Sequence, residues 1–540
     1  MTSLSKLLSH LFFIFPVLSC FCVSFEDEQN FEFDLPEKQV PFLFHRRPDL
    51  LKSCLKSDIC PYKDLLKEQI DAGEFSCFGY EDNCDVSNRT SYSNGRVLCS
   101  GESNWHTIKT KREQIRAFWN QGDFGYVKDH VRHMKTICAP DSGNPTDSSL
   151  ICSDHLRYCY AKNIMFDFRN LQSKGNTNKY REDIIQKGDV GGRCRLDVNL
   201  LRSRTDQHSP LQSWAAELKH FKRFDNFSFE NCDIIYEKPV IFIKLDAGIS
   251  MYHHFCDFVN LYASQHINGS FHQDVHIIQW DTSGMPYIDF FAETWKAFTD
   301  LPLIHLKELD RKKVCFRQAM FPLLARMMFG LYYNMPLIGG CAGSGFMHAF
   351  SEHVLHRLKL TQMGPRKDGR LRVTFLSRGT KYRRILNEDE LISGLKTMVE
   401  LDVRKVDYAK LPFLLQLNQT LNTDIFMGIH GSGLTHLLFL PDWAAVFEIY
   451  NCDDPNCYLD LARLRGVGYF TWERESKVRP EDEGHHPTLG AHAKFTNYWM
   501  DLEEFLRIAS RMVQYVKNHK ALKEAVERND GDKAVWRNEL

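Results

Sequence analysis

From residue 240 onward, short apolar runs alternate with longer helix-like segments, and this alternation restricts the fold more than any other feature. The runs cover 240–245, 275–280, 372–376, 424–429 and 444–450. One helical pattern spans 347–360, and a second begins at Asn387, which has Glu390 three residues later, as in a capping box. Strands that alternate with helices are typical of parallel sheets, so we expect an α/β fold of the doubly wound kind.

A polar, glycine-bearing segment at 361–370 divides this region. We therefore expect a first α/β lobe over 231–365 and a second over 366–515, with ligands held between them at the carboxyl ends of strands. We expect residues 25–230 to form a cysteine-bearing, loop-rich N-terminal region that partly contributes to the first lobe. Within it we expect loops at 191–192 and 203–210. Residues 516–540 form the C-terminal tail.

The N-terminus has the layout of a secretory signal peptide over residues 1–24. Lys6 precedes an apolar run at 7–23, and acidic residues follow it. The alternative is an uncleaved membrane anchor, but the run is short and is interrupted by His10 and Pro16. No later stretch is apolar for long enough to cross a bilayer, so we expect a chain that spans no membrane after the signal is removed.

The C-terminus resembles an address for retention in the endoplasmic reticulum. It keeps a basic first position and the Glu-Leu end of the Lys-Asp-Glu-Leu signal, although asparagine replaces aspartate; the residues are Arg537, Asn538, Glu539 and Leu540. A chance tail is the alternative. Together the two ends predict a resident of the endoplasmic-reticulum lumen that is bound by a retention receptor.

Composition agrees with that compartment. Ten of the 17 cysteines lie between Cys54 and Cys232, where disulfides can staple loops. Four tripeptides match the N-glycosylation sequon, at Asn88, Asn226, Asn268 and Asn418. The net charge of -1 and the lack of a basic tract argue against nucleic acid as a partner.

A histidine motif follows the first predicted strand of the first lobe. Asp246, His253, His254 and Asp257 lie between that strand and a helix-like segment. An imidazole at such a turn can remove a proton near neutral pH, and a carboxylate four residues on can orient it. The alternative is a helix N-terminus with satisfied polar side chains.

Two loops of the second lobe suit a diphosphate. Arg378, Arg383 and Arg384 follow a strand and can clamp phosphate oxygens, unless they form only a solvated basic loop. A glycine-rich turn follows the next strand, where backbone amides can approach phosphate, unless the turn is purely structural; its residues are His430, Gly431, Ser432, Gly433, Leu434 and Thr435. Glu448 can contact a ribose or lie on the surface.

These motifs together resemble glycosyltransferase family 61. The family motif Tyr-His-x-Phe-x-Asp is matched from Tyr252 to Asp257, its Ser-Arg turn by Ser377 and Arg378, and its glycine-rich loop from Gly428 to Thr435. The resemblance runs from about residue 105 to the tail and is densest at 209–217, 244–262, 424–468 and 484–490.

The resemblance implies a GT-B-like pair of Rossmann-type lobes facing a cleft. It further implies transfer of N-acetylglucosamine from UDP-GlcNAc to Ser or Thr of folded EGF-like repeats, which occur in Notch-type receptors and extracellular matrix proteins. We expect this transfer to be a single inverting displacement at the anomeric carbon. His253 is then the general base, oriented by Asp257, with His254 and Asp246 as reserves. The alternatives are another acceptor, such as an O-mannosyl glycan, another donor, such as UDP-xylose, or a non-catalytic lumenal protein that binds EGF repeats.

One triplet departs from the family pattern. Relatives carry an Asp-x-Asp-like triplet that appears here as Asp300, Leu301 and Pro302, and proline cannot bind a metal. Arginines and helix-terminal amides can neutralise the leaving diphosphate instead. A divalent cation such as Mn²⁺ therefore remains only an option, and no cofactor is predicted with a defined ligand set.

Overall fold

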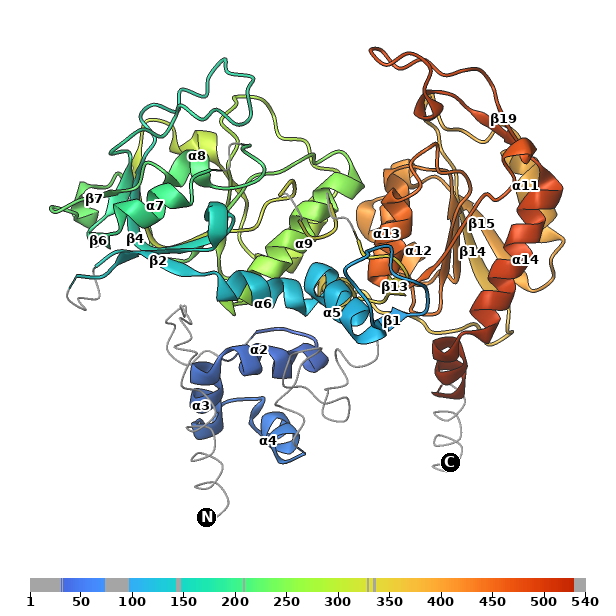
Figure 1. The fold of residues 1–540 in the computed structure, drawn as a ribbon, viewed down its shortest axis with the longest axis horizontal. Coiled ribbons are helices and arrows are strands. Elements are labelled where there is room, and N and C mark those ends of the chain that lie inside the picture. The colour runs from blue at the N-terminus through green and yellow to red at the C-terminus, as the bar shows by residue number, and fades with distance from the viewer. Residues whose placement is uncertain are drawn as a thin grey trace.

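Two sheets organise the chain, as Figure 1 shows for a computed structural model. The structure describes residues 31–528 except 32, 73–96, 142–146, 207–208, 328–329 and 334–336. The predicted signal peptide, the retention-like tail and Asn88 lie outside these residues. No helix in the described part of the chain is long and apolar enough to cross a membrane.

The first sheet is mixed and has 11 strands among the described residues, in the order β11-β10-β9-β12-β4-β3-β2-β6 with β5, β7 and β8 beside it. Strands β9, β10 and β11 pair in parallel, whereas β12 and β4 pair antiparallel over their whole length. The strands are β2 (Lys135–Ala139), β3 (Ser149–Cys152), β4 (Cys159–Asp167), β5 (Val190–Gly192), β6 (Arg195–Leu196), β7 (Lys222–Arg223), β8 (Ile234–Tyr236), β9 (Val240–Ile243), β10 (His276–Gln279), β11 (Ile304–His305) and β12 (Lys313–Phe321).

The cysteine-bearing region is less loop-rich than its composition indicates, because it supplies β2 to β7 to this sheet. The expected loop at 191–192 is wrong: both glycines lie in strand β5. A Cβ on Gly191 would lie 2.0 Å from the backbone oxygen of Lys222, and one on Gly192 would lie 2.2 Å from Ser148 Oγ. Glycine therefore serves close backbone approach here, not a turn.

Disulfides tie this region together and to more distant elements. Cys54–Cys60 and Cys152–Cys159 are local, Cys138–Cys194 closes a loop within the cysteine-bearing region, and Cys99–Cys341 and Cys232–Cys315 join more distant segments. Cys99–Cys341 joins β1 (Leu98–Cys99) to β13 (Cys341–Ala342), which pair with each other. Among the described cysteines, Cys256, Cys452 and Cys457 are free thiols.

The second sheet is parallel, with the order β15-β14-β16-β17-β18. Its strands are β14 (Leu371–Leu376), β15 (Leu401–Val406), β16 (Ile425–Gly428), β17 (Ala445–Glu448) and β18 (Gly468–Thr471). Numbered along the chain this is 2-1-3-4-5, an order that changes direction between β14 and β16. Ligands of open α/β sheets bind at the carboxyl ends of the strands that flank such a point.

Helices cover both sheets, and a shared apolar core joins them. One buried cluster spans the first sheet and continues across one face of the second, while a separate cluster fills the other face of the second sheet. The remaining helices are α2 (Val40–Arg46), α3 (Pro48–Lys56), α4 (Lys63–Asp71), α5 (Lys111–Gly122), α6 (Phe124–Arg132), α7 (Val198–Ser203), α8 (Ala215–Leu218), α9 (Met251–Asn268), α10 (Gly345–Arg357), α11 (Glu388–Lys396), α12 (Phe413–Leu421), α13 (Cys457–Arg465) and α14 (Leu502–Asn518).

Short 3₁₀ helices complete the elements: η1 (Glu37–Gln39), η4 (Asp154–Leu156), η5 (Phe229–Asn231), η6 (Ala292–Ala297), η7 (Leu306–Leu309), η8 (Tyr408–Lys410), η9 (Ser432–Phe439), η10 (Glu475–Lys477) and η11 (Ala493–Phe495). A two-stranded sheet pairs β19 (Val478–Pro480) with β20 (Tyr498–Met500).

The five strands predicted after residue 240 are confirmed within two residues at each end. The predicted helix over 347–360 lies at Gly345–Arg357, and the expected break at 361–370 is coil. Asn387 does precede a helix, but the capping box is wrong. Its side chain donates to the Glu390 carboxylate at 2.9 Å but makes no capping bond to the helix backbone, and it pairs with the backbone of Met500 in β20, accepting at 3.0 Å and donating at 2.8 Å.

Candidate active site

A cleft of about 810 Å³ lies where the two sheets face each other. We call the part of the molecule built on the first sheet the first half and the part built on the second sheet the second half. The first half contributes residues at the N-terminus of α9 and in the loop after β12. The second half contributes the loops after β14, β16 and β17 and the start of α13. The lining residues are Ser250, Tyr252, His253, Tyr332, Tyr333, Arg378, Arg383, His430, Gly431, Ser432, Asp454, Asn456, Cys457, Tyr458, Asp460 and Lys494. Tyr252 and Tyr458 meet across the cleft with ring centroids 5.6 Å apart.

His253 is held for proton transfer by a carboxylate behind it. Its Nδ1 lies 2.7 Å from Asp246 Oδ2, and Arg326 Nε donates to the same oxygen at 2.9 Å. Burial raises the pKa of Asp246, but the hydrogen bonds from His253 and Arg326 outweigh it and lower the pKa below its usual value. Because a carboxylate only accepts, Nδ1 carries the proton and Nε2 is left as an acceptor. The His253 side chain is 30% exposed, at the cleft surface.

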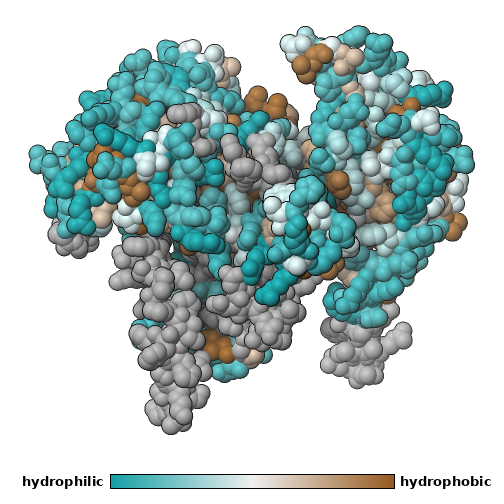
Figure 2. All heavy atoms as spheres, viewed as in Figure 1, coloured by the Kyte–Doolittle hydropathy of each residue, from teal (hydrophilic) through white to brown (hydrophobic). Residues whose placement is uncertain are grey.

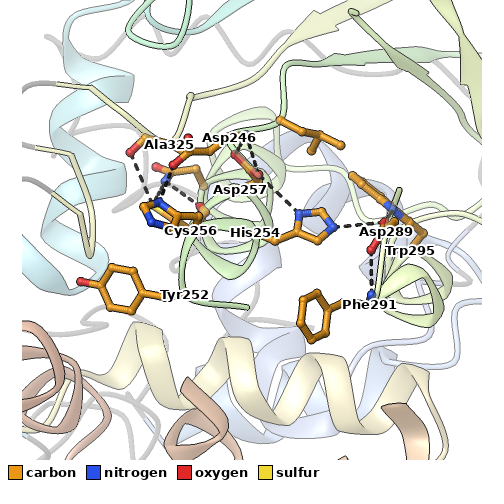
Figure 3. A network of polar contacts seen from close by, with 12 residues as sticks. Asp246, Tyr252, His254, Cys256, Asp257, Asp289, Phe291, Trp295 and Ala325 are labelled. Atoms are coloured by element: carbon orange, nitrogen blue, oxygen red, sulfur yellow. Dashed lines mark hydrogen bonds and ion pairs between the residues drawn. The ribbon is translucent and has the colours of Figure 1, made fainter. Parts of the chain in front are cut away.

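Asp257, the residue expected to orient His253, does not do so. It is buried, accepts from the backbone amide of Asp246 at 3.1 Å, and lies 3.4 Å from His254 Nδ1 (Figure 3). Helix α9 begins at Met251, and its rotation points Asp257 inward, while the preceding turn brings Asp246 back onto His253. The structure therefore replaces Asp257 with Asp246 as the partner of His253.

His254 lies in a buried network and faces away from the cleft. Asp257 holds its Nδ1, and Asp289 holds its Nε2 at 3.1 Å (Figure 3). Burial lowers the pKa of His254, but the two carboxylates outweigh it and raise the pKa to about 9. A fully buried imidazolium at neutral pH has no free nitrogen, so His254 is unsuited to the role of reserve base.

Two arginines lie at the carboxyl ends of β14 and β16. Arg378 Nε donates to Thr380 Oγ1 at 2.6 Å, and Arg383 Nη1 donates to the carbonyl of His430 at 3.3 Å. Burial and the charge of Arg383 lower the pKa of Arg378 to about 10. Within the described residues neither guanidinium has a carboxylate at ion-pair distance, so the cleft holds two uncompensated positive charges.

The glycine-rich turn brings backbone against these charges. A Cβ on Gly431 would lie 2.2 Å from Arg378 Nη1, so a side chain here would displace the guanidinium from its present position. Gly431 precedes η9, and Asn456 precedes α13, so two helix N-termini and two arginines line one part of the cleft. This combination suits an anion with several phosphate oxygens.

His430 and Glu448 form a pair beneath this turn. His430 Nδ1 lies 2.7 Å from Glu448 Oε1, and Tyr469 donates to the other carboxylate oxygen. Glu448 is fully buried, so it positions His430 and does not reach a ribose in the cleft. The position of Glu448 on a surface, the alternative from sequence, is also excluded.

Other sequence candidates lie outside this cleft. Arg384 lines an adjoining depression of about 320 Å³ beside the start of α11, which shares Arg378 with the cleft, and Leu434 and Thr435 are buried beneath the turn. Asp300 is exposed and does not line the cleft. No group of three or more His, Cys, Asp or Glu side chains in the described ranges is arranged to hold a metal ion.

The sequons differ in accessibility. Asn226 and Asn418 are exposed, whereas Asn268 is 6% exposed at the end of α9. A buried amide does not suit a glycan, so the structure favours Asn226 and Asn418.

Several residues in or beside the cleft were not predicted from the sequence. Arg326 follows β12 and reaches Asp246 from 80 residues away, and its guanidinium lies 5.0 Å from the ring centroid of Tyr333. Lys494 pairs with Asp454 at 2.7 Å. Asp454 and Asn456 precede α13 and lie in the segment 424–468, where the family resemblance is dense, and that resemblance was the signal available for them.

Comparison with known proteins adds two findings. Residues 251–447 match the family described as Glycosyltransferase 61. The match begins at the first residue of α9 and ends in β17, so it contains His253, Arg378 and the Gly431 turn.

Full-length relatives extend the match over nearly the whole chain. A Rattus norvegicus protein is 52% identical over 491 residues, covering 90% of each chain, and a Gallus gallus protein is 51% identical with the same coverage. A Drosophila melanogaster protein is 44% identical, covering 86% of this chain and 88% of its own. Each is named EGF domain-specific O-linked N-acetylglucosamine transferase.

Proposed function

We propose that this chain, which belongs to glycosyltransferase family 61, transfers N-acetylglucosamine from UDP-GlcNAc to Ser or Thr hydroxyls of folded EGF-like domains. The names of its relatives support this acceptor and this sugar. The observation that carries the proposal is that His253, backed by Asp246, and the unpaired Arg378 and Arg383 line the same cleft from opposite halves.

The second half takes the donor in this proposal. The arginine pair and the amides near Gly431 and Asn456 hold the diphosphate of UDP-GlcNAc at the point where the strand order changes direction. A volume of about 810 Å³ matches the size of small-molecule pockets, roughly 300–1,000 Å³. Two α/β sheets that flank a cleft also favour a GT-B-like architecture for the whole enzyme.

The first half supplies the base. The acceptor oxygen attacks the anomeric carbon as the bond from that carbon to the UDP oxygen breaks, and the hydroxyl proton passes to Nε2 of His253. Attack opposite the leaving group inverts the anomeric configuration. Asp246 stabilises the imidazolium that forms, and Arg378 and Arg383 stabilise the charge on the departing diphosphate. A positioned base contributes about 10²–10⁴-fold to the rate.

The oxidised cysteines support a lumenal location for this reaction. Five disulfides among the described residues form and persist in an oxidising compartment. We place the enzyme in the endoplasmic-reticulum lumen, where folded, disulfide-bonded acceptor domains are also found.

The test is an assay of the purified protein with UDP-GlcNAc and a refolded EGF-like domain, read by the mass of the domain. UDP-xylose is the matched donor control. A domain that gains mass only with UDP-xylose, or with neither donor, contradicts the proposal.

Two variants test the roles within the site. We expect His253→Ala to lose at least about 100-fold in kcat with unchanged UDP binding, since only the base is removed. We expect Arg378→Ala to weaken UDP binding. Arg384 does not line the cleft, so we expect Arg384→Ala to bind UDP as tightly as the wild type. Wild-type turnover of folded His253→Ala, or unchanged UDP affinity of Arg378→Ala, refutes that residue's role.

A further inference from the structure

Four exposed apolar side chains lie on two neighbouring segments of the first half, and we call them the rim patch: Ile249, Met285, Ile288 and Phe290. They are 60%, 51%, 57% and 63% exposed. Large apolar side chains gathered at one surface mark interaction sites more often than single ones do. In Figure 2 hydrophobic residues lie at the upper edge of the left half, beside the hollow between the halves.

The two segments are packed against each other. The amide of Phe290 donates to the carbonyl of Gly248 at 3.1 Å. A Cβ on Gly248 would lie 2.4 Å from the backbone oxygen of Ile288, so the close approach depends on glycine. Ile249 follows Gly248 directly, which places it beside this loop.

A buried anchor turns the apolar side chains outward. Asp289 points inward, where its carboxylate accepts from the Phe291 amide at 2.7 Å, from Tyr287 and Trp295 at 2.8 Å, and from His254 at 3.1 Å (Figure 3). Its neighbours on either side, Ile288 and Phe290, therefore project into solvent. Because the loop is fixed before any partner arrives, docking on it costs little conformational entropy.

The rim patch adjoins the edge of the cleft at Ser250. Ser250 and His253 line the cleft, and Ile249 precedes them on the same turn into α9. The cleft is of a size for a nucleotide sugar, not for a folded protein domain. A folded acceptor must therefore rest outside the cleft while one hydroxyl reaches Nε2 of His253, and the rim patch is an exposed apolar surface that begins one residue before Ser250, at the edge of that cleft.

We propose that the rim patch is the docking surface for the folded acceptor domain, which places an apolar or aromatic side chain of its own against Ile288 and Phe290. This inference rests on the proposed function and deepens it. Apolar and aromatic residues at the centre of an interface carry most of its binding energy, and a polar surround excludes water.

The test compares Ile288→Ser/Phe290→Ser with a matched control, Met363→Ser/Val399→Ser. The control residues are 73% and 84% exposed and belong to the segments before β14 and β15. All four side chains are exposed, so both proteins are expected to fold, as circular dichroism and thermal unfolding check. The measurements are KM and kcat with a refolded EGF-like domain, and the shift in melting temperature caused by UDP.

We expect the rim variant to show a KM for the domain raised by about tenfold or more, with kcat and the UDP-induced shift unchanged. The control variant should match the wild type in all three. An unchanged KM overturns the docking surface, and so does a loss confined to kcat, which would mean that the loop acts on His253. Failure of the wild type to modify the domain refutes the proposed function instead.

Discussion

Two adjacent histidines, His253 and His254, have opposite surroundings. The first has one carboxylate behind it and a free nitrogen at the cleft, while the second is buried between Asp257 and Asp289. Sequence cannot separate them, because both follow the same strand. The difference arises from their orientation on α9, where neighbouring residues point about 100° apart.

Asp246→Asn tests whether His253 depends on its partner. The amide keeps the shape of the side chain but not its charge, so the imidazolium that forms during transfer loses its stabilisation. We expect kcat to fall by about 10–100-fold with UDP binding unchanged, and the pH profile of kcat to shift. Asp274→Asn, a surface carboxylate paired with Lys238, serves as the control. An unaltered pH profile would show that Asp246 is only structural.

The buried imidazolium predicts a pH-dependent stability. Because the folded pKa of His254 is raised to about 9, its contribution is fully present below about pH 6.5, the ordinary histidine value, and is lost as pH rises through 9. We expect the difference in unfolding free energy between wild type and His254→Gln to shrink by up to about 3 kcal/mol between pH 6.5 and 9.5. Denaturant unfolding of both proteins measures it, and a difference that is constant with pH contradicts the assignment.

At the scale of elements, the donor side is made by the turns after β14 and β16. These two strands are neighbours in the sheet, so their carboxyl ends bring Arg378 and Gly431 into contact, although 53 residues separate them. The contact depends on Gly431, the third residue after β16, having no side chain.

Gly431→Ala is expected to displace the Arg378 guanidinium, since the new methyl group would lie 2.2 Å from Nη1. UDP affinity should fall by about tenfold or more while the melting temperature stays within a few degrees. Gly379→Ala is the matched control: it lies beside Arg378, but its Cβ would meet Asp407 at an ordinary 3.4 Å. Equal UDP affinity in the two variants would count against the contact.

At the scale of the molecule, Cys99–Cys341 links segments 242 residues apart, whereas Cys152–Cys159 spans only 7. A longer closed loop restricts the unfolded chain more. Replacing both cysteines of a pair by alanine should therefore lower the free energy of unfolding more for Cys99–Cys341 than for Cys152–Cys159. The difference between the two losses should be roughly 2–3 kcal/mol. Thermal and denaturant unfolding of the two double variants compare them, and equal losses would show that the loop-length argument does not apply here.

The sequence by itself determined the α/β character and the positions of the central strands, because buried parallel strands are continuous apolar runs bounded by polar turns. It also placed Arg378, His253 and the Gly431 turn at strand ends. The resemblance carried by the same motifs led to the family, which the relatives then established.

Only the tertiary structure decided which of these residues work together. The pairing of His253 with Asp246, the arrival of Arg326, the burial of Glu448 and the separation of Arg384 from the cleft depend on helix rotation and on contacts between distant segments. The strands of the cysteine-bearing region were missed for the same reason: all but β4 are short, and β4 is held in the sheet by its pairing with β12, more than 140 residues later. Local patterns fix where an element begins, whereas the direction of each side chain is set by the packing of the whole chain.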